Sequence, residues 1–152
     1  MNHIRVSIKA IIIRGGEILL TRNRDQQGIF YLLPGGGQNP GEAVADALRR
    51  ECLEEVGVPV EAGPLLFVRD YISANHEFAG EHEHVHQLEL MFAAILREDP
   101  ARGGATNPDT MQEDIEWVPL KALQEYRLYP SALKTLLTKP LPEGALYLGD
   151  VN

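Results

Sequence analysis

The chain has 152 residues and a formal net charge of −8 at pH 7, from 22 acidic and 14 basic side chains. Its length fits one domain with a single core, and 44% hydrophobic residues are ordinary for a globular protein. The negative charge argues against a general binder of nucleic-acid polymers, which shows a basic stripe, but it allows a small anionic ligand that is held through metal ions.

Nothing in the sequence predicts a disulfide framework or a membrane anchor. Cys52 is the one cysteine of the chain, so an internal disulfide is excluded. The longest apolar run near the N-terminus covers residues 10–13, which is far short of a membrane span. We therefore expect a cytoplasmic protein with no membrane partner.

The predicted elements start with strands, which the apolar patterning places in chain order. A hairpin is expected around Gly15 and Gly16, and the third strand ends sharply because Pro34 and three glycines follow it. After one long helix come further strands and two short helices, each with proline in its first turn. The expected strands cover residues 3–13, 17–21, 29–33, 58–73, 85–96 and 115–118, and the short helices cover residues 119–126 and 130–138. Residues 139–152 are too irregular to assign.

The long helix is predicted over residues 40–56. Asn39 can cap its N-terminus, Pro40 suits the first turn, and Glu42 completes a capping box three residues after the cap. Gly57 can end the helix in the left-handed conformation. This order of elements predicts an α+β or mixed α/β fold, and a Rossmann fold is not expected because no G-x-G-x-x-G motif follows the first strand.

Three carboxylates share the inner face of this helix. On a helical wheel that advances by about 100° per residue, Glu51, Glu54 and Glu55 continue the apolar stripe of the earlier turns. Charges that lean toward the interior must be compensated. Arg50 can neutralise one of them, and the remaining oxygen ligands suit Mg²⁺ or Mn²⁺. The alternative is a glutamate-rich helix end that is exposed to solvent, and it stays open on these grounds.

The segment from Gly36 to Val58 resembles a known family, because it matches the Nudix box at every fixed position. The matching residues are Gly36, Glu42, Arg50, Glu51, Cys52, Glu54, Glu55, Gly57 and Val58. Cys52 stands where an aliphatic residue is usual, and Asn39 stands where many members have Glu. The resemblance implies a Nudix-type α/β/α sandwich with a mixed central β-sheet, as one domain over residues 1–152 with its core at about residues 3–138.

The resemblance also implies a chemistry, since Nudix enzymes hydrolyse a nucleoside diphosphate linked to another group with water and a divalent metal. The implied cofactor is Mg²⁺, with Mn²⁺ as a substitute. Carried over by position, the metal ligands are the carboxylates of Glu51, Glu54 and Glu55 and the carbonyl of Gly35. Glu51 and Glu54 are also catalytic candidates, because one carboxylate helps to deprotonate water, and Arg50 orients Glu51. The expected partner is a small nucleotide, and a homodimer is left open because dimers are frequent in the family.

Further candidates lie outside the box. Many members use one more acidic residue as a general base, and Glu113 is the first choice here; the alternative for it is a solvated loop charge. Arg22 and Arg24 follow the hairpin and can neutralise a phosphate, although exposed arginines are usually surface residues. His84 and His86 alternate with His82 on one face of an extended segment. Because the strand that they enter leads into the core, we expect one or two of them to line the substrate cleft; exposure to solvent and chelation of a transition metal are the alternatives. The other acidic candidates are Asp114, Glu81, Glu83 and Glu89.

Two other functions compete with hydrolysis. A Nudix-fold module that binds a nucleotide without cutting it usually loses glutamates of the box, and this chain keeps all three. A prenyl-diphosphate isomerase resembles a longer chain with a catalytic cysteine elsewhere, and Cys52 lies inside the box. The substrate of a hydrolase stays open among nucleoside triphosphates, ADP-ribose, nucleotide sugars and dinucleoside polyphosphates, because variable loops select it.

Overall fold

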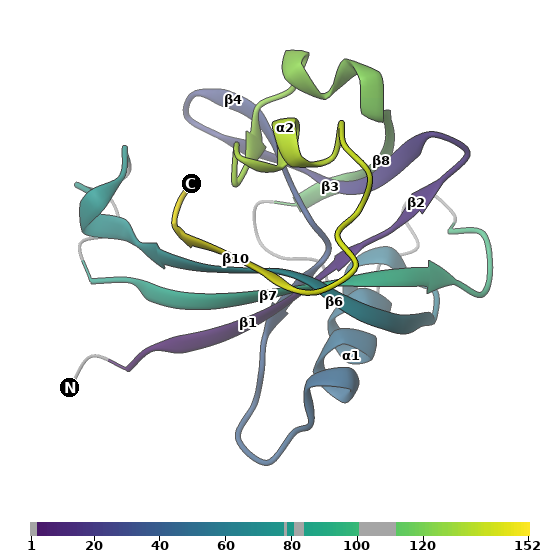
Figure 1. Ribbon diagram of the computed structural model, residues 1–152, viewed down its shortest axis with the longest axis horizontal. Coiled ribbons are helices and arrows are strands. Elements are labelled where there is room, and N and C mark those ends of the chain that lie inside the picture. The colour runs from purple at the N-terminus through teal and green to yellow at the C-terminus, as the bar shows by residue number, and fades with distance from the viewer. Residues whose placement is uncertain (1–2, 78, 81–83, 101–111) are drawn as a thin grey trace.

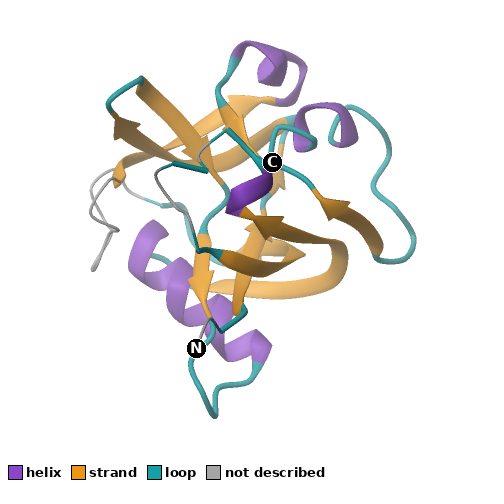
Figure 2. Ribbon diagram, turned by 90° about the vertical axis from the view of Figure 1, so that its left-hand side faces the viewer, coloured by secondary structure: helices purple, strands orange, loops and turns teal. Residues whose placement is uncertain are grey.

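The structure is a computed structural model that describes residues 3–77, 79–80, 84–100 and 112–152. Its strands form two sheets that pack face to face, with one long helix on the outer face of the first sheet (Figures 1 and 2). The first sheet has the order β10 (Leu146–Asp150), β6 (Val60–Ile72), β7 (His86–Leu96), β1 (Arg5–Ile11) and β5 (Gly35–Gly37). The second has the order β2 (Ile13–Arg14), β3 (Glu17–Asp25), β4 (Gly28–Leu32) and β9 (Leu128–Tyr129), with β8 (Gln112–Pro119) paired to β3.

Both sheets mix parallel and antiparallel pairs. In the first sheet β1 runs parallel to β7, whereas β6 and β7 are antiparallel. In the second sheet β4 runs parallel to β9, and β3 pairs antiparallel with β4 and β8. The expected mixed α+β class is therefore confirmed, but the strands are divided between two sheets instead of forming one central sheet.

Two hydrophobic clusters hold these layers together. The first fills the space between the two sheets and includes Leu20, Phe67 and Met91. The second lies between the helix α1 (Val44–Val56) and the first sheet, and it includes Leu48 and Cys52. Cys52 is fully buried, and burial raises the pKa of its thiol above the ordinary value. The thiol thus serves as a core side chain, as its place in the helix predicts.

The strand predicted over residues 3–13 is broken in two. Residues 5–11 join the first sheet, and residues 13–14 start the hairpin of the second sheet. Gly15 and Gly16 form the hairpin turn with φ of 58° and 77°, the conformation that a two-residue turn between twisted strands requires. One apolar run in the sequence therefore carries the chain from one sheet to the other.

The start of the long helix differs from the prediction. The helix α1 begins at Val44 instead of residue 40, because Gly41 has φ of +80° and cannot be part of a right-handed helix. Glu42 still accepts a hydrogen bond from the Asn39 N–H at 3.0 Å, but it does so across a turn. The end is confirmed: Gly57 is left-handed, and its N–H donates to the Leu53 carbonyl at 3.0 Å.

The C-terminal third also departs from the sequence-based assignment. The strand β10 lies in residues that the sequence leaves unassigned, and it runs parallel to β6 at the sheet edge. Leu146 and Tyr147 are exposed in it, so the strand has no buried alternation that a pattern could reveal. The two predicted helices are shorter than expected: η2 (Leu120–Glu125) is a 3-10 helix and α2 (Leu133–Leu136) has one turn. A further 3-10 turn, η1 (Ser73–Asn75), follows β6. Within the described residues, no helix is both long and apolar enough to cross a membrane.

Candidate active site

The three glutamates of the helix α1 face the first sheet, as the wheel predicts. Glu55 is buried, with 7% of its surface exposed, and the side chains of Glu51 and Glu54 are 16% and 29% exposed. Asp46 and Arg49 lie on the opposite face of the same helix, where they are exposed and paired with each other. The alternative of a fully solvated glutamate cluster is therefore excluded.

Glu55 is held by the glycine strand β5. Its Oε2 accepts a hydrogen bond from the Gly35 N–H at 2.8 Å. Only glycine fits at position 35, because φ is +136° and an added Cβ would lie 2.0 Å from the Ile8 carbonyl oxygen. The backbone of β5 thus comes close enough to the helix to satisfy a buried carboxylate.

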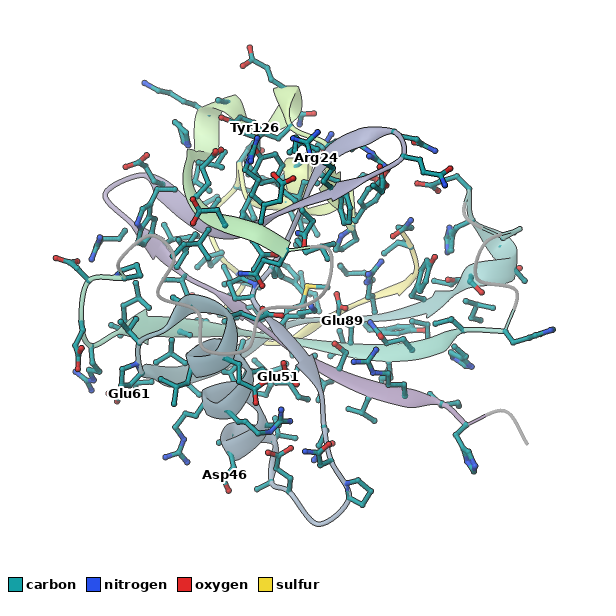
Figure 3. All side chains as sticks on the ribbon, turned by 180° about the vertical axis from the view of Figure 1, so that it is seen from behind. Arg24, Asp46, Glu51, Glu61, Glu89 and Tyr126 are labelled. Atoms are coloured by element: carbon teal, nitrogen blue, oxygen red, sulfur yellow. The ribbon has the colours of Figure 1, made fainter. Side chains whose placement is uncertain are left out.

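Glu51 occupies the space that the absence of a side chain at Gly36 leaves open. A Cβ on Gly36 would lie 2.5 Å from the Glu51 carboxyl carbon and from its Oε2. Figure 3 shows Glu51 between the helix and the strand that carries the glycines. The two glycines therefore act differently: the Gly35 N–H binds the Glu55 carboxylate, and Gly36 leaves space for the Glu51 carboxylate.

Arg50 ties the carboxylates to the loop that precedes the helix. Its Nε and Nη2 donate to the two carboxylate oxygens of Glu42 at 2.8 and 3.0 Å, and its Nη1 donates to Glu51 at 2.8 Å. Its Nη2 also donates to the Gly37 carbonyl, and Glu54 lies 3.8 Å from Nη1. The hydrogen bonds from Arg50 lower the pKa of Glu42 to about 2. The expected contact of Arg50 with Glu51 is therefore confirmed, and the structure adds a paired contact of Arg50 with Glu42.

The donor set that the resemblance assigns to a metal consists of hard oxygen atoms, namely the carboxylates of Glu51, Glu54 and Glu55 and the carbonyl of Gly35. Oxygen donors of this kind suit Mg²⁺ and Mn²⁺. Among the described residues, no three His, Cys, Asp or Glu side chains converge on one point as placed. Instead, Arg50 and the Gly35 N–H engage the carboxylates. The donors therefore fit a divalent ion by chemical type.

Lys9 is a site residue that the sequence pattern does not reveal. Its Nζ donates to the carbonyls of Gly35 and Leu33 at 3.1 and 3.3 Å. The strand β1 pairs Lys9 directly opposite Gly35. In the sequence Lys9 is one charged residue in an apolar strand, and only the pairing of β1 with β5 brings its ammonium to the glycines.

A cavity of about 480 Å³ lies between the two sheets and reaches Gly35 and Gly36. The first sheet contributes its floor from three neighbouring strands, and the second sheet contributes an apolar and aromatic wall. The floor residues are Arg5, Ser7, Lys9, Arg69, Tyr71, Gln87 and Glu89, and the wall residues include Phe30, Leu32 and Tyr129. The cavity is thus lined by charged side chains on its floor, by aromatic side chains on its wall, and by the glycines of β5, which lie beside the helix carboxylates.

Glu113, Arg22 and Arg24 form a cluster of their own. Glu113 accepts hydrogen bonds from Arg22 at 2.7 Å and from Arg24. Its neighbour Gln112 points the other way and donates to the Glu55 carbonyl, as expected because successive side chains of a strand alternate between its faces. Arg24 lies far from Glu51 in Figure 3. The structure therefore brings these three predicted residues to one another and not to the box carboxylates or the cavity lining.

The histidines and the other acidic candidates differ in how they relate to the cavity. His86 pairs with Asp70 at 2.9 Å, and His84 is exposed; neither is among the residues that line the cavity. Asp114 accepts a hydrogen bond from the Ile115 N–H, and Glu89 lies on the cavity floor. His82, Glu81 and Glu83 lie outside the described residues.

Comparison with known proteins agrees with this geometry. A family model described as NUDIX domain matches residues 2–138. The chain belongs to the Nudix family. The nucleoside triphosphatase NudI of Escherichia fergusonii is 31% identical over 146 residues, which cover 90% of this chain and 97% of that protein. This membership identifies the chain as a Nudix hydrolase.

Solved structures support the fold assignment of this Nudix hydrolase. A MutT NUDIX hydrolase from Burkholderia pseudomallei has a TM-score of 0.63 and 31% identity, covering 78% of this chain and 85% of its own. A NUDIX hydrolase from Nitrosomonas europaea has a TM-score of 0.67 at 20% identity, covering 82% and 78%. The latter similarity concerns the fold alone.

Proposed function

We propose that this Nudix hydrolase cleaves a phosphoanhydride bond in a nucleoside diphosphate linked to a second group, with water and a divalent metal. The observation that carries the proposal is the placement of Glu51, Glu54 and Glu55 on the inner face of the helix α1, against the glycine strand that the cavity reaches. Carboxylates in this position meet the substrate at one end of a pocket that is large enough for a nucleotide.

Glu51, Glu54, Glu55 and the Gly35 carbonyl would hold Mg²⁺, or Mn²⁺ in its place, and the bound ion would supply neutralisation of phosphate charge and a lowered pKa of water. The residues of the chain have complementary tasks. Arg50 positions the Glu51 carboxylate through its hydrogen bond at 2.8 Å. A carboxylate of Glu51 or Glu54 accepts the proton of the attacking water.

Cations on the floor of the cavity favour the phosphates of the substrate. Lys9 donates to two backbone carbonyls, and Arg5 lies beside Gly37, where a Cβ would meet its guanidinium at 2.9 Å. Both side chains line the cavity at the end where the glycines lie. An ammonium and a guanidinium next to the scissile bond attract and orient an anionic substrate.

A nucleoside triphosphate is the substrate class that we favour. The E. fergusonii relative at 31% identity bears the name nucleoside triphosphatase, and a cavity of about 480 Å³ is in the usual range for a small-molecule site. The test is a panel of nucleoside triphosphates, ADP-ribose and nucleotide sugars, with product analysis by chromatography. We expect turnover with Mg²⁺ and its loss in excess chelator. A metal-loaded protein that binds nucleotides and hydrolyses none of them would instead be a binding module.

A further inference from the structure

The cavity has two chemically different ends. Gly35, Gly36 and Lys9 lie at one end, next to the helix carboxylates. Tyr71 on β6 and the Phe30–Tyr129 pair on the opposite wall line its aromatic part. Aromatic side chains suit the flat face of a nucleobase. If the phosphates lie at the glycines, the base of the same nucleotide lies among the aromatic side chains.

Gln87 lies in the middle of the floor beside this aromatic part. It is directly opposite Tyr71 on one neighbouring strand and opposite Arg5 on the other. Residues directly opposite in a sheet project to the same face, so the three side chains form one row across the floor. All three line the cavity.

The amide of Gln87 has a fixed orientation. Its Nε2 donates to Glu89 Oε2 at 2.9 Å. An ionised carboxylate only accepts hydrogen bonds, so the NH₂ end of the amide must face Glu89. The oxygen of Gln87 is therefore the end of the amide that is directed away from Glu89.

Glu89 is itself held in place by a buried ion pair. It is 3% exposed, and its Oε1 accepts a hydrogen bond from Arg69 Nε at 3.1 Å. Arg69 is 5% exposed and also donates to the carbonyl of Val151 and to Asn152. A buried pair with satisfied partners is rigid. The hydrogen bonds from Arg69 to Glu89 and from Gln87 to Glu89 thus fix the direction of the Gln87 Oε1 acceptor before any ligand binds.

We propose that Gln87 is a specificity-determining residue of this hydrolase, whose Oε1 accepts a hydrogen bond from an N–H group on the edge of the substrate base. The assignment rests on the proposed function, because that function places the phosphates at the glycines. Arg69 and Glu89 are positioning residues in this arrangement, since Glu89 holds the Gln87 amide and Arg69 holds Glu89. A preset acceptor favours bases that present a donor at that edge and disfavours those that present an acceptor.

The test is the binding of nucleoside monophosphates to the metal-free protein, followed by NMR titration, with ribose 5-phosphate as the ligand without a base. Gln87→Leu should weaken the best-bound monophosphate by about tenfold, which is the usual effect of one lost hydrogen bond to a buried group. Its affinity for ribose 5-phosphate should not change. Gln124→Leu is the matched control, because Gln124 is an exposed glutamine that donates to the Lys134 carbonyl away from the cavity.

The outcomes separate this inference from the proposed function. If the wild-type protein hydrolyses nucleotides and Gln87→Leu leaves the ranking of the four bases unchanged, the assignment of Gln87 is wrong and the function stands. If the wild-type protein discriminates among monophosphates through Gln87 and hydrolyses no nucleotide, the assignment stands and the function is wrong. Should Gln87→Leu not fold, Gln87→Met keeps the length of the side chain and removes the amide, and the same two comparisons apply.

Discussion

Glu55 and Gly35 are twenty residues apart in the chain, and the N–H of Gly35 donates to the Glu55 carboxylate at 2.8 Å. This contact fixes the inner face of the helix α1 to the backbone of β5. It also stabilises a carboxylate that is only 7% exposed, since an amide N–H that donates to a negative oxygen favours its charged form. The Glu51 carboxylate reaches the same strand one residue further, at Gly36.

Glu55→Gln should lower hydrolysis by a factor of about 100 or more while the fold is kept. The amide oxygen of glutamine can still accept the Gly35 N–H, but the charge that holds a divalent ion is lost. Steady-state rates with Mg²⁺ and thermal unfolding should be measured together. Asp46→Asn on the exposed face of the same helix is the control and should retain the wild-type rate. A folded Glu55→Gln protein with normal turnover would remove Glu55 from the proposed metal site.

Gly36→Ala should impair activity more than stability. The backbone at this position permits alanine, since its φ lies outside the left-handed region, but the new Cβ would meet the Glu51 carboxyl group at 2.5 Å. The side chain of Glu51 must then move out of its position beside Arg50. We expect a loss of at least about tenfold in kcat/KM, in line with the effect of displaced catalytic groups. Gly144→Ala, where a Cβ meets nothing within 4 Å, is the matched control; equal rates for both variants would contradict the argument.

Glu42→Gln should make the free energy of unfolding depend less on pH in the acidic range. The pKa of Glu42 is lowered from 4.5 to about 2 by Arg50, so its ionised form favours the folded state. That contribution is fully present above the pKa of the unfolded chain, near 4.5, and is lost as the pH falls toward 2. Urea unfolding of both proteins at a series of pH values measures it. The difference in unfolding free energy between the wild type and Glu42→Gln should be constant near neutrality and should shrink below pH 4.5. A difference that grows as the pH falls would contradict the prediction.

Glu113→Gln should change turnover by less than about threefold. Glu113 is paired with Arg22 and Arg24 on the face of β8 that is opposite to Gln112, and exposed ion pairs contribute little to stability. A general base must come within hydrogen-bond distance of the attacking water, directly or through one water molecule. The pH profile of kcat/KM for this variant and the wild type decides the matter: loss of the acidic limb together with most of the rate would restore Glu113 as the base.

The features that could be predicted from the sequence are those that depend on spacing within one element. The positions of Glu51, Glu54 and Glu55 on one face follow from the helical repeat, and Gly57 ends the helix through its own conformational freedom. The predicted start of that helix, residue 40, was wrong by four residues. The capping pattern does not show that Gly41 has a left-handed conformation. The strand β10 could not be predicted, since an exposed edge strand carries no buried alternation.

The sequence by itself thus determined the family box, the helix and the direction in which its carboxylates point, because the period of a helix converts spacing into orientation. The tertiary structure alone decided which side chains from other strands meet them. Lys9 reaches Gly35 through the pairing of β1 with β5, and Gln87 stands between Tyr71 and Arg5 through the register of three strands. Strand register joins residues that are distant in the chain, and it is set by the burial of whole faces and not by any local pattern.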